Sequence, residues 1–120
     1  MGASVLEREL VHACPSFRDV WASLRASYAG EPPSAKDFLG ALRSHVLMLV
    51  ADGRSAEVTR LCYALERLLG EADPILEKLL VDEFVKPLAG GCAGDPASAA
   101  ALVPHLGPRT RRAWDQAAAR

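Results

Sequence analysis

The sequence predicts an all-α fold, with a single helical domain over residues 1–120. Apolar residues recur every three or four positions, which is the spacing of amphipathic helices. No segment alternates apolar and polar residues for the length of a strand, and Ala and Leu are abundant while β-branched residues are scarce. We expect a compact helical bundle or a short stack of antiparallel helix pairs, with five main helices plus one or two short C-terminal ones.

Start signals mark the first three helices. Ser4 and Glu7 have the spacing of a capping box, in which a hydroxyl and a carboxylate accept from free backbone N–H groups at a helix start. Ser16 and the pair Ser34 and Asp37 give weaker signals of the same kind. With the apolar stripes that follow, they predict helices at residues 4–13, 16–29 and 34–52. The third helix has a wide apolar arc, so we expect it at the centre of the fold.

The later helices begin after clear breaks. Residues 55–71 carry the cleanest apolar stripe, formed by Val58, Leu61, Cys62, Leu65, Leu68 and Leu69. The predicted polar side of this helix carries Glu57, Arg60, Arg67 and Glu71. Asp73-Pro74 and Asp95-Pro96 place a capping carboxylate before a proline at the first helical position, and Gly107-Pro108 is similar. We expect helices at 74–87, 96–103 and 108–118, with a break at residues 87–94.

Composition excludes several classes of protein. Half of the residues are hydrophobic and 24% are charged, which excludes a disordered or fibrous chain. Fourteen Lys and Arg against fifteen Asp and Glu give a net charge of −1, so we expect no nucleic-acid partner. The longest apolar run, Val46–Ala51, is too short to span a membrane, and the N-terminus lacks a secretory signal pattern. We therefore expect a soluble cytoplasmic protein with no membrane partner.

The cysteines and histidines predict neither a metal site nor a cofactor. They are far apart in the sequence and form no Cys-x-x-Cys or His-Glu-x-x-His motif: Cys14, Cys62, Cys92, His12, His45 and His105. We expect Cys62 to pack in the core and His45 to be a half-buried, hydrogen-bonded imidazole. Cys92 lies among the glycines of residues 90–94, where we expect an exposed, flexible turn. No spacing in the sequence is typical of a catalytic site.

Two charge features suggest a partner surface. Between Glu66 and Glu83 there are six acids and two bases, a local net charge of −4. Glu83 falls on the apolar arc of its helix, so it either pairs with Lys86 three residues on or lies in a groove that meets a basic partner. The second feature places Arg109, Arg111 and Arg112 beside Trp114, which is either part of an interface or the anchor that docks a terminal helix.

The segment from Val103 to Asp115, with Leu106-Gly107-Pro108 followed by Trp114-Asp115, is distinctive. It resembles the closing segment of a family of small bacterial all-helical proteins known only as a domain of unknown function. The stretch Cys14-Pro15-Ser16-Phe17 is similar in type. The resemblance implies an all-helical single domain and supplies no activity, and that family tends to carry a small residue where this chain has Glu83.

We expect a non-catalytic protein-binding module, with an immunity-type inhibitor of a cognate bacterial toxin as the favoured form. The alternatives are a structural or adaptor subunit of a larger complex, and an enzyme or small-ligand binder whose site is assembled from scattered residues. The expected partner is another protein with a basic surface. Tyr63 is the expected anchor, because a large amphipathic ring at the edge of a charged face suits an interface. The full set of expected partner-binding residues is Tyr63, Glu66, Glu71, Glu77, Asp82 and Glu83.

Overall fold

The computed structural model describes residues 3–28, 30–31 and 33–118 of the chain, and within these ranges it contains helices and no strand. The all-α prediction is therefore confirmed. The elements are α1 (Ala3–Ala13), α2 (Phe17–Ser27), α3 (Ala35–Ala51), α4 (Ser55–Glu71), α5 (Pro74–Leu80), the π-helical turn η1 (Val81–Val85), α6 (Lys86–Cys92), α7 (Pro96–Leu102), the 3₁₀ turn η2 (Val103–His105) and α8 (Pro108–Ala118).

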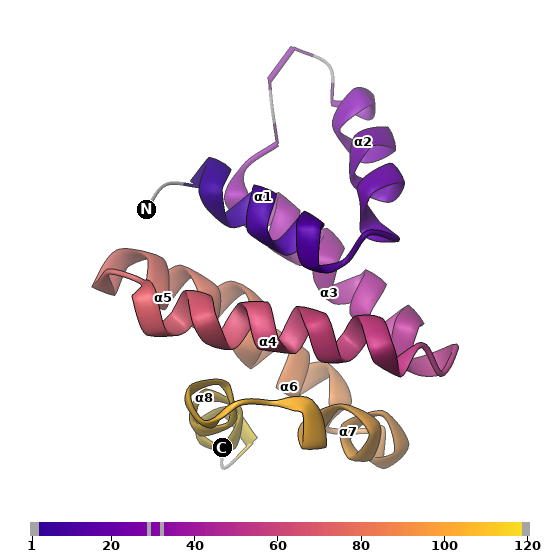
Figure 1. Ribbon diagram of the computed structural model, residues 1–120, viewed down its shortest axis with the longest axis vertical. Helices are drawn as coiled ribbons and strands as arrows, with labels where there is room; N and C mark the ends of the chain where they lie inside the picture. The colour runs from indigo at the N-terminus through magenta and orange to yellow at the C-terminus, as the bar shows by residue number, and fades with distance from the viewer. Residues whose placement is uncertain (1–2, 29, 32, 119–120) are drawn as a thin grey trace.

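Helix α4 crosses the middle of the molecule (Figure 1), with α1 and α2 on one side and α7 and α8 on the other. It packs against α1, α3 and α8. Helix α3 packs against α1, α2, α4, α7 and η1, which agrees with its wide apolar arc. The turn between α3 and α4 depends on Gly53, whose φ of +72° places it in the left-handed region that other residues rarely adopt.

The core is continuous through the bundle. Phe17, Trp21 and Phe38 form an aromatic group between α2 and α3, and the Trp21 and Phe38 rings meet edge to face with centroids 4.9 Å apart. The Trp21 indole N–H donates to Glu7 of α1 at 2.6 Å, and this hydrogen bond links α2 to α1 beside the aromatic group. At the other side of the bundle Trp114 is buried under α8. Trp114 is thus the anchor of the terminal helix, one of the two roles considered for it.

The structure corrects one boundary of the sequence analysis. The chain does not break at Pro87: α5, η1 and α6 follow one another without interruption from Pro74 to Cys92. The π turn ends just before Pro87, and the Lys86 N–H bonds to the carbonyl of Val81, five residues back. Pro87 has no N–H to donate, and it lies where the hydrogen bonding returns from the π pattern to the α pattern. Burial of Leu88 and Cys92 in the core outweighs the poor helix propensity of the glycines in α6.

The helix starts were predicted with mixed success. Ser34 and Asp37 form the expected reciprocal capping box, and Asp73 and Asp95 accept from the backbone N–H groups of the residues three positions on. The expected capping box of Ser4 and Glu7 lies outside the described residues, because the structure does not describe the side chain of Ser4. Ser16 precedes α2 as expected, but its side chain makes no cap bond within that helix. Its hydroxyl points instead to another part of the fold.

None of the helices in the described part of the chain is long and apolar enough to cross a bilayer.

Candidate functional site

Two poorly exposed carboxylates on α4 organise the polar interior. Glu57 and Glu66 are nine residues apart, which places them about half a turn from each other on opposite sides of the helix. Each accepts hydrogen bonds from residues at the start of a different helix. Glu57 accepts from Ser16, just before α2, and Glu66 accepts from Arg109 and Thr110 in the first turn of α8. Glu66 accepts from free N–H groups at a helix start, whereas Glu57 accepts from the Ser16 hydroxyl, so α4 is bonded to the starts of both α2 and α8.

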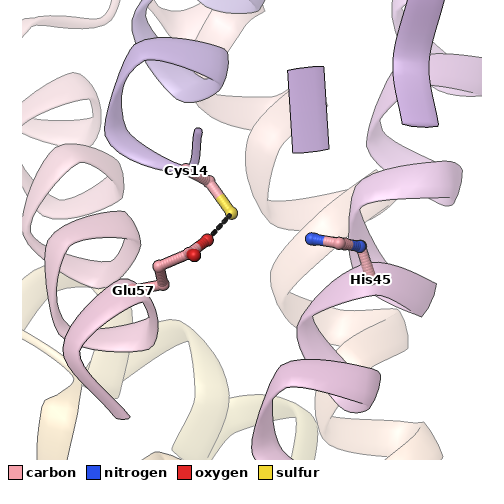
Figure 2. A group of neighbouring side chains, drawn as sticks. All are labelled: Cys14, His45 and Glu57. Carbon is pink, nitrogen blue, oxygen red and sulfur yellow. Dashed lines mark hydrogen bonds between the residues drawn. The ribbon is translucent and has the colours of Figure 1, made fainter. Parts of the chain in front are cut away.

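The first carboxylate, Glu57, lies in a cluster with the Cys14 thiol and the His45 imidazole (Figure 2), and the Ser16 hydroxyl also bonds to it. Glu57 Oε2 accepts from Ser16 Oγ at 2.5 Å and from Cys14 Sγ at 3.4 Å, and Oε1 accepts from Arg54 at 2.6 Å. Ser16 Oγ also lies 2.8 Å from His45 Nε2. The Ser16 hydroxyl has one proton, and it donates this proton to the carboxylate. His45 Nε2 must therefore be the donor to Ser16.

Burial and hydrogen bonding set the protonation states of this cluster. The hydrogen bond from Ser16 lowers the pKa of Glu57 and outweighs the opposing effect of burial. Burial raises the pKa of the Cys14 thiol to about 11, and burial also lowers the pKa of His45. At neutral pH the cluster thus holds an ionised carboxylate, a protonated thiol and a neutral imidazole. A thiol in that state is a poor nucleophile, and the imidazole is not oriented by a carboxylate as a catalytic base is.

Only part of this cluster could be predicted from the sequence. His45 is hydrogen-bonded as expected, although it is buried rather than half-buried. Glu57 was wrongly placed on the polar side of α4, since it is 8% exposed. A signal was present: Glu57 precedes Leu61 by four residues and Leu65 by eight, and so lies on the apolar stripe. The long separation of Cys14 from Glu57 gave no sign that the fold joins them.

The second carboxylate explains the distinctive turn before α8. Glu66 accepts from the backbone N–H groups of Arg109 at 3.0 Å and Thr110 at 2.9 Å, and from the Thr110 hydroxyl at 2.9 Å. Burial alone would raise the pKa of Glu66, but these hydrogen bonds from Thr110 and Arg109 outweigh it and hold the pKa below its usual value. A Cβ on Gly107 would lie within 2.6 Å of Glu66 Cδ, so only glycine leaves room for the carboxylate. Pro108 then begins the helix.

The expected partner-binding residues differ in exposure and in their partners within the chain. Tyr63 is 74% exposed on α4, and Glu71 and Glu77 are exposed without an ion pair among the described residues. Glu66 is turned into the chain, where it caps α8. Of these residues, Glu66 is therefore engaged within the chain, whereas Tyr63, Glu71 and Glu77 are exposed.

The remaining two acids are paired within the chain. Asp82 binds Lys78 at 2.7 Å and Lys86 at 3.4 Å. Glu83 lies 3.9 Å from Lys36 of α3, so its expected pairing with Lys86 was wrong. The π turn widens the helix at this point, and residues three apart no longer align as they do in an α-helix. The charge of α5 that remains unpaired is chiefly that of Glu77.

An open groove of about 520 Å³ separates α5 from α8 and brings the two charge features of the sequence together. We call it the α5/α8 groove, and it is lined by Leu69, Pro74, Glu77, Lys78, Val81, Asp82, Arg109, Arg112, Ala113 and Gln116. Glu77, Lys78 and Asp82 come from α5 and η1 on one side of the groove, and Arg109 and Arg112 come from α8 on the other. A mixture of charged and apolar lining residues is compatible with a protein-binding surface.

The expectation for Cys92 was also wrong. Cys92 is 3% exposed and Cys62 is 5% exposed, so both thiols lie in the core. Continuation of the helix through Gly90 and Gly91 places Cys92 on the same buried face as Leu88. Burial raises the pKa of Cys62 to about 12 and raises that of Cys92 as well.

These features define an all-α protein whose polar interior serves helix capping and whose surface carries a charged groove. The chain belongs to the family described as domain of unknown function DUF7674, whose model matches residues 7–119. The resemblance to a family of unknown function is thereby confirmed. No curated protein and no solved structure matched the chain.

Proposed function

We propose that this protein is a non-catalytic protein-binding module and that its partner docks at the α5/α8 groove. The observation that carries the proposal is the groove itself, which is lined by Glu77, an acid without an ion pair among the described residues, and by Arg109 and Arg112 of α8. An interface with opposite charges on its two walls fixes the orientation of a partner as well as attracting it. The partner we propose presents basic side chains to the α5 wall.

The interior supports a binding role over a catalytic one. The enclosed cavity bordered by Val46, Phe84 and Trp114 has a volume of only about 10 Å³, too small for a substrate. Glu66 is engaged in capping the start of α8. The α5/α8 groove is open and shallow enough to receive a protein loop.

An immunity-type inhibitor of a bacterial toxin is the form of module that we favour. The unpaired acids Glu71 and Glu77 would speed encounter with a basic toxin surface, and inhibition needs a single tight complex. A structural or adaptor subunit would use the same groove for several partners. We place the interaction in the cytoplasm, where the three unpaired cysteines stay reduced.

The test is a comparison of baits in cells of the native organism, followed by mass spectrometry. Glu77→Lys should lose the protein that the wild type captures, because it reverses the unpaired charge on the groove wall. Asp52→Lys is the matched control: it makes the same charge change at the α3–α4 turn, at the opposite end of α4 from Leu69 of the groove. Circular dichroism checks that both variants keep their helices.

One protein captured by the wild type and by Asp52→Lys, and lost with Glu77→Lys, supports the proposal. Several unrelated proteins lost together would favour the adaptor. Equal capture by Glu77→Lys and the wild type would exclude the α5/α8 groove as the interface.

A further inference from the structure

We propose that Cys14, His45 and Glu57 form a binding site for one divalent transition-metal cation of the zinc class. The site is independent of the α5/α8 groove and of the function proposed there. The fold brings a sulfur, a nitrogen and an oxygen donor from three parts of the chain to within 4.8 Å of one another. All three residues are buried, and Figure 2 shows their side chains directed toward a common space.

The spacing of the donors is close to that of a metal centre. Zinc binds sulfur at about 2.3 Å and imidazole nitrogen or carboxylate oxygen at about 2.0–2.2 Å, so tetrahedral donors lie roughly 3.3–3.7 Å apart. Cys14 Sγ and Glu57 Oε2 are already 3.4 Å apart. The widest pair exceeds the tetrahedral value by only about one ångström, which side-chain rotation of His45 can supply.

Ser16 occupies the middle of the cluster in the metal-free protein. Its hydroxyl lies 2.8 Å from His45 Nε2 and 3.8 Å from Cys14 Sγ, and it donates to Glu57. The Ser16 side chain makes no cap bond within α2, so its rotation breaks only its contacts with Glu57, His45 and Cys14. When the metal binds, this hydroxyl moves outward and becomes the fourth ligand or gives way to water.

The binding step balances in protons and charge. The Cys14 thiol releases its proton to solvent and binds as a thiolate. His45 stays neutral but changes tautomer: its proton moves by exchange with solvent from Nε2, which donates to Ser16 in the metal-free protein, to Nδ1, so that Nε2 presents a lone pair to the metal. A dication with one thiolate and one carboxylate has no net charge, which is the condition for burying it in a helical core.

The donor set selects the class of metal. Calcium and magnesium prefer all-oxygen sites, whereas a thiolate with an imidazole and a carboxylate suits zinc and its neighbours. Arg54 holds the other oxygen of Glu57 at 2.6 Å, which orients Oε2 toward the cluster. Partners of this kind around a metal ligand contribute to affinity through orientation. The sequence could not indicate the site, because its ligands share no local motif.

The test is titration of the full chain, freed of metal by a chelator, with zinc and with cobalt. We expect binding of about one equivalent, a rise in the melting temperature with zinc, and a thiolate-to-cobalt charge-transfer band with cobalt. Cys14→Ala and His45→Ala should lose the stoichiometric binding. Cys62→Ala and His105→Ala are the matched controls, a buried thiol and an imidazole outside the cluster, and they should bind as the wild type does. Arg54→Ala should weaken zinc binding roughly tenfold while leaving the ligands in place.

Failure of the wild type to take up zinc or cobalt overturns the proposal. Equal binding by Cys14→Ala and the wild type does so too, since it would show an adventitious ion at the surface. If the variants do not fold, the cobalt spectrum of the wild type still tests the proposal. Cobalt bound to the wild type without a thiolate-to-cobalt band would exclude Cys14 as a ligand.

Discussion

Replacing Gly107 by alanine should destabilise the protein through its effect on Glu66. The new Cβ would lie within 2.6 Å of Glu66 Cδ, and this carboxylate cannot turn aside without releasing the start of α8. Gly107 has no positive φ, so the substitution introduces no backbone strain. The loss of stability therefore measures the capping of α8 by Glu66.

The structure gives the size of the effect. When Glu66 is displaced, the backbone N–H groups of Arg109 and Thr110 and the Thr110 hydroxyl lose their common acceptor. Loss of a helix cap costs about 1–2 kcal/mol, and partly buried donors left without a partner place this case toward the upper end. Gly107→Ala and Glu66→Ala should each reduce the free energy of unfolding by about 1–2 kcal/mol. For a chain of this length, that corresponds to a fall in melting temperature of about 4–8 °C.

The double variant distinguishes this mechanism from others. Once Glu66→Ala has removed the carboxylate, Gly107→Ala has nothing to displace. The double variant should therefore lose about 1–2 kcal/mol, not the roughly 2–4 kcal/mol expected for independent sites. Urea unfolding followed by circular dichroism provides the three free energies. Gly90→Ala is the control: its Cβ would meet nothing within 4 Å, and it should leave stability unchanged or raise it by about 1 kcal/mol. Additive losses of unfolding free energy in the double variant would refute the proposal that Gly107→Ala acts by displacing Glu66.

Two further predictions concern pH and thiol reactivity. Because the pKa of Glu66 is lower in the folded protein than its usual value of 4.5, its contribution to stability is complete above that value and is lost as the pH falls through the folded pKa. Glu66→Gln should flatten the pH dependence of the urea midpoint below about pH 4.5, and an unchanged slope would contradict the assignment. Cys62 and Cys92 should both react slowly with a thiol reagent in the folded protein, because both are buried, and rapid labelling of Cys92 alone would show that α6 ends before it.

Local patterns in the sequence were sufficient to predict most of the helices. Helix periodicity and capping residues such as Asp73 and Asp95 are short-range features, and the structure confirms them. The continuation of the helix through Pro87 depends on core packing of Leu88 and Cys92, which no local rule contains. Tertiary burial there outweighed the intrinsic preferences of proline and glycine.

The polar sites were harder to predict, because their residues meet only in the fold. Cys14 and Glu57 are joined by the packing of α1 on α4, and Glu66 reaches α8 across a stretch of sequence that is about as long. An acid on a helix surface looks the same in sequence whether it faces a partner or caps another helix. This is why Glu66 was expected at an interface, although it is used within the chain.

The most direct test of the proposed binding function is the association rate of the captured partner with the wild type and with Glu77→Lys at two salt concentrations. At low ionic strength Glu77→Lys should associate roughly tenfold more slowly, with Asp52→Lys close to the wild type, because Glu77 is the unpaired acid on the groove wall. The difference should shrink as salt screens the charges. Equal association rates for the wild type and Glu77→Lys at low salt would contradict the account.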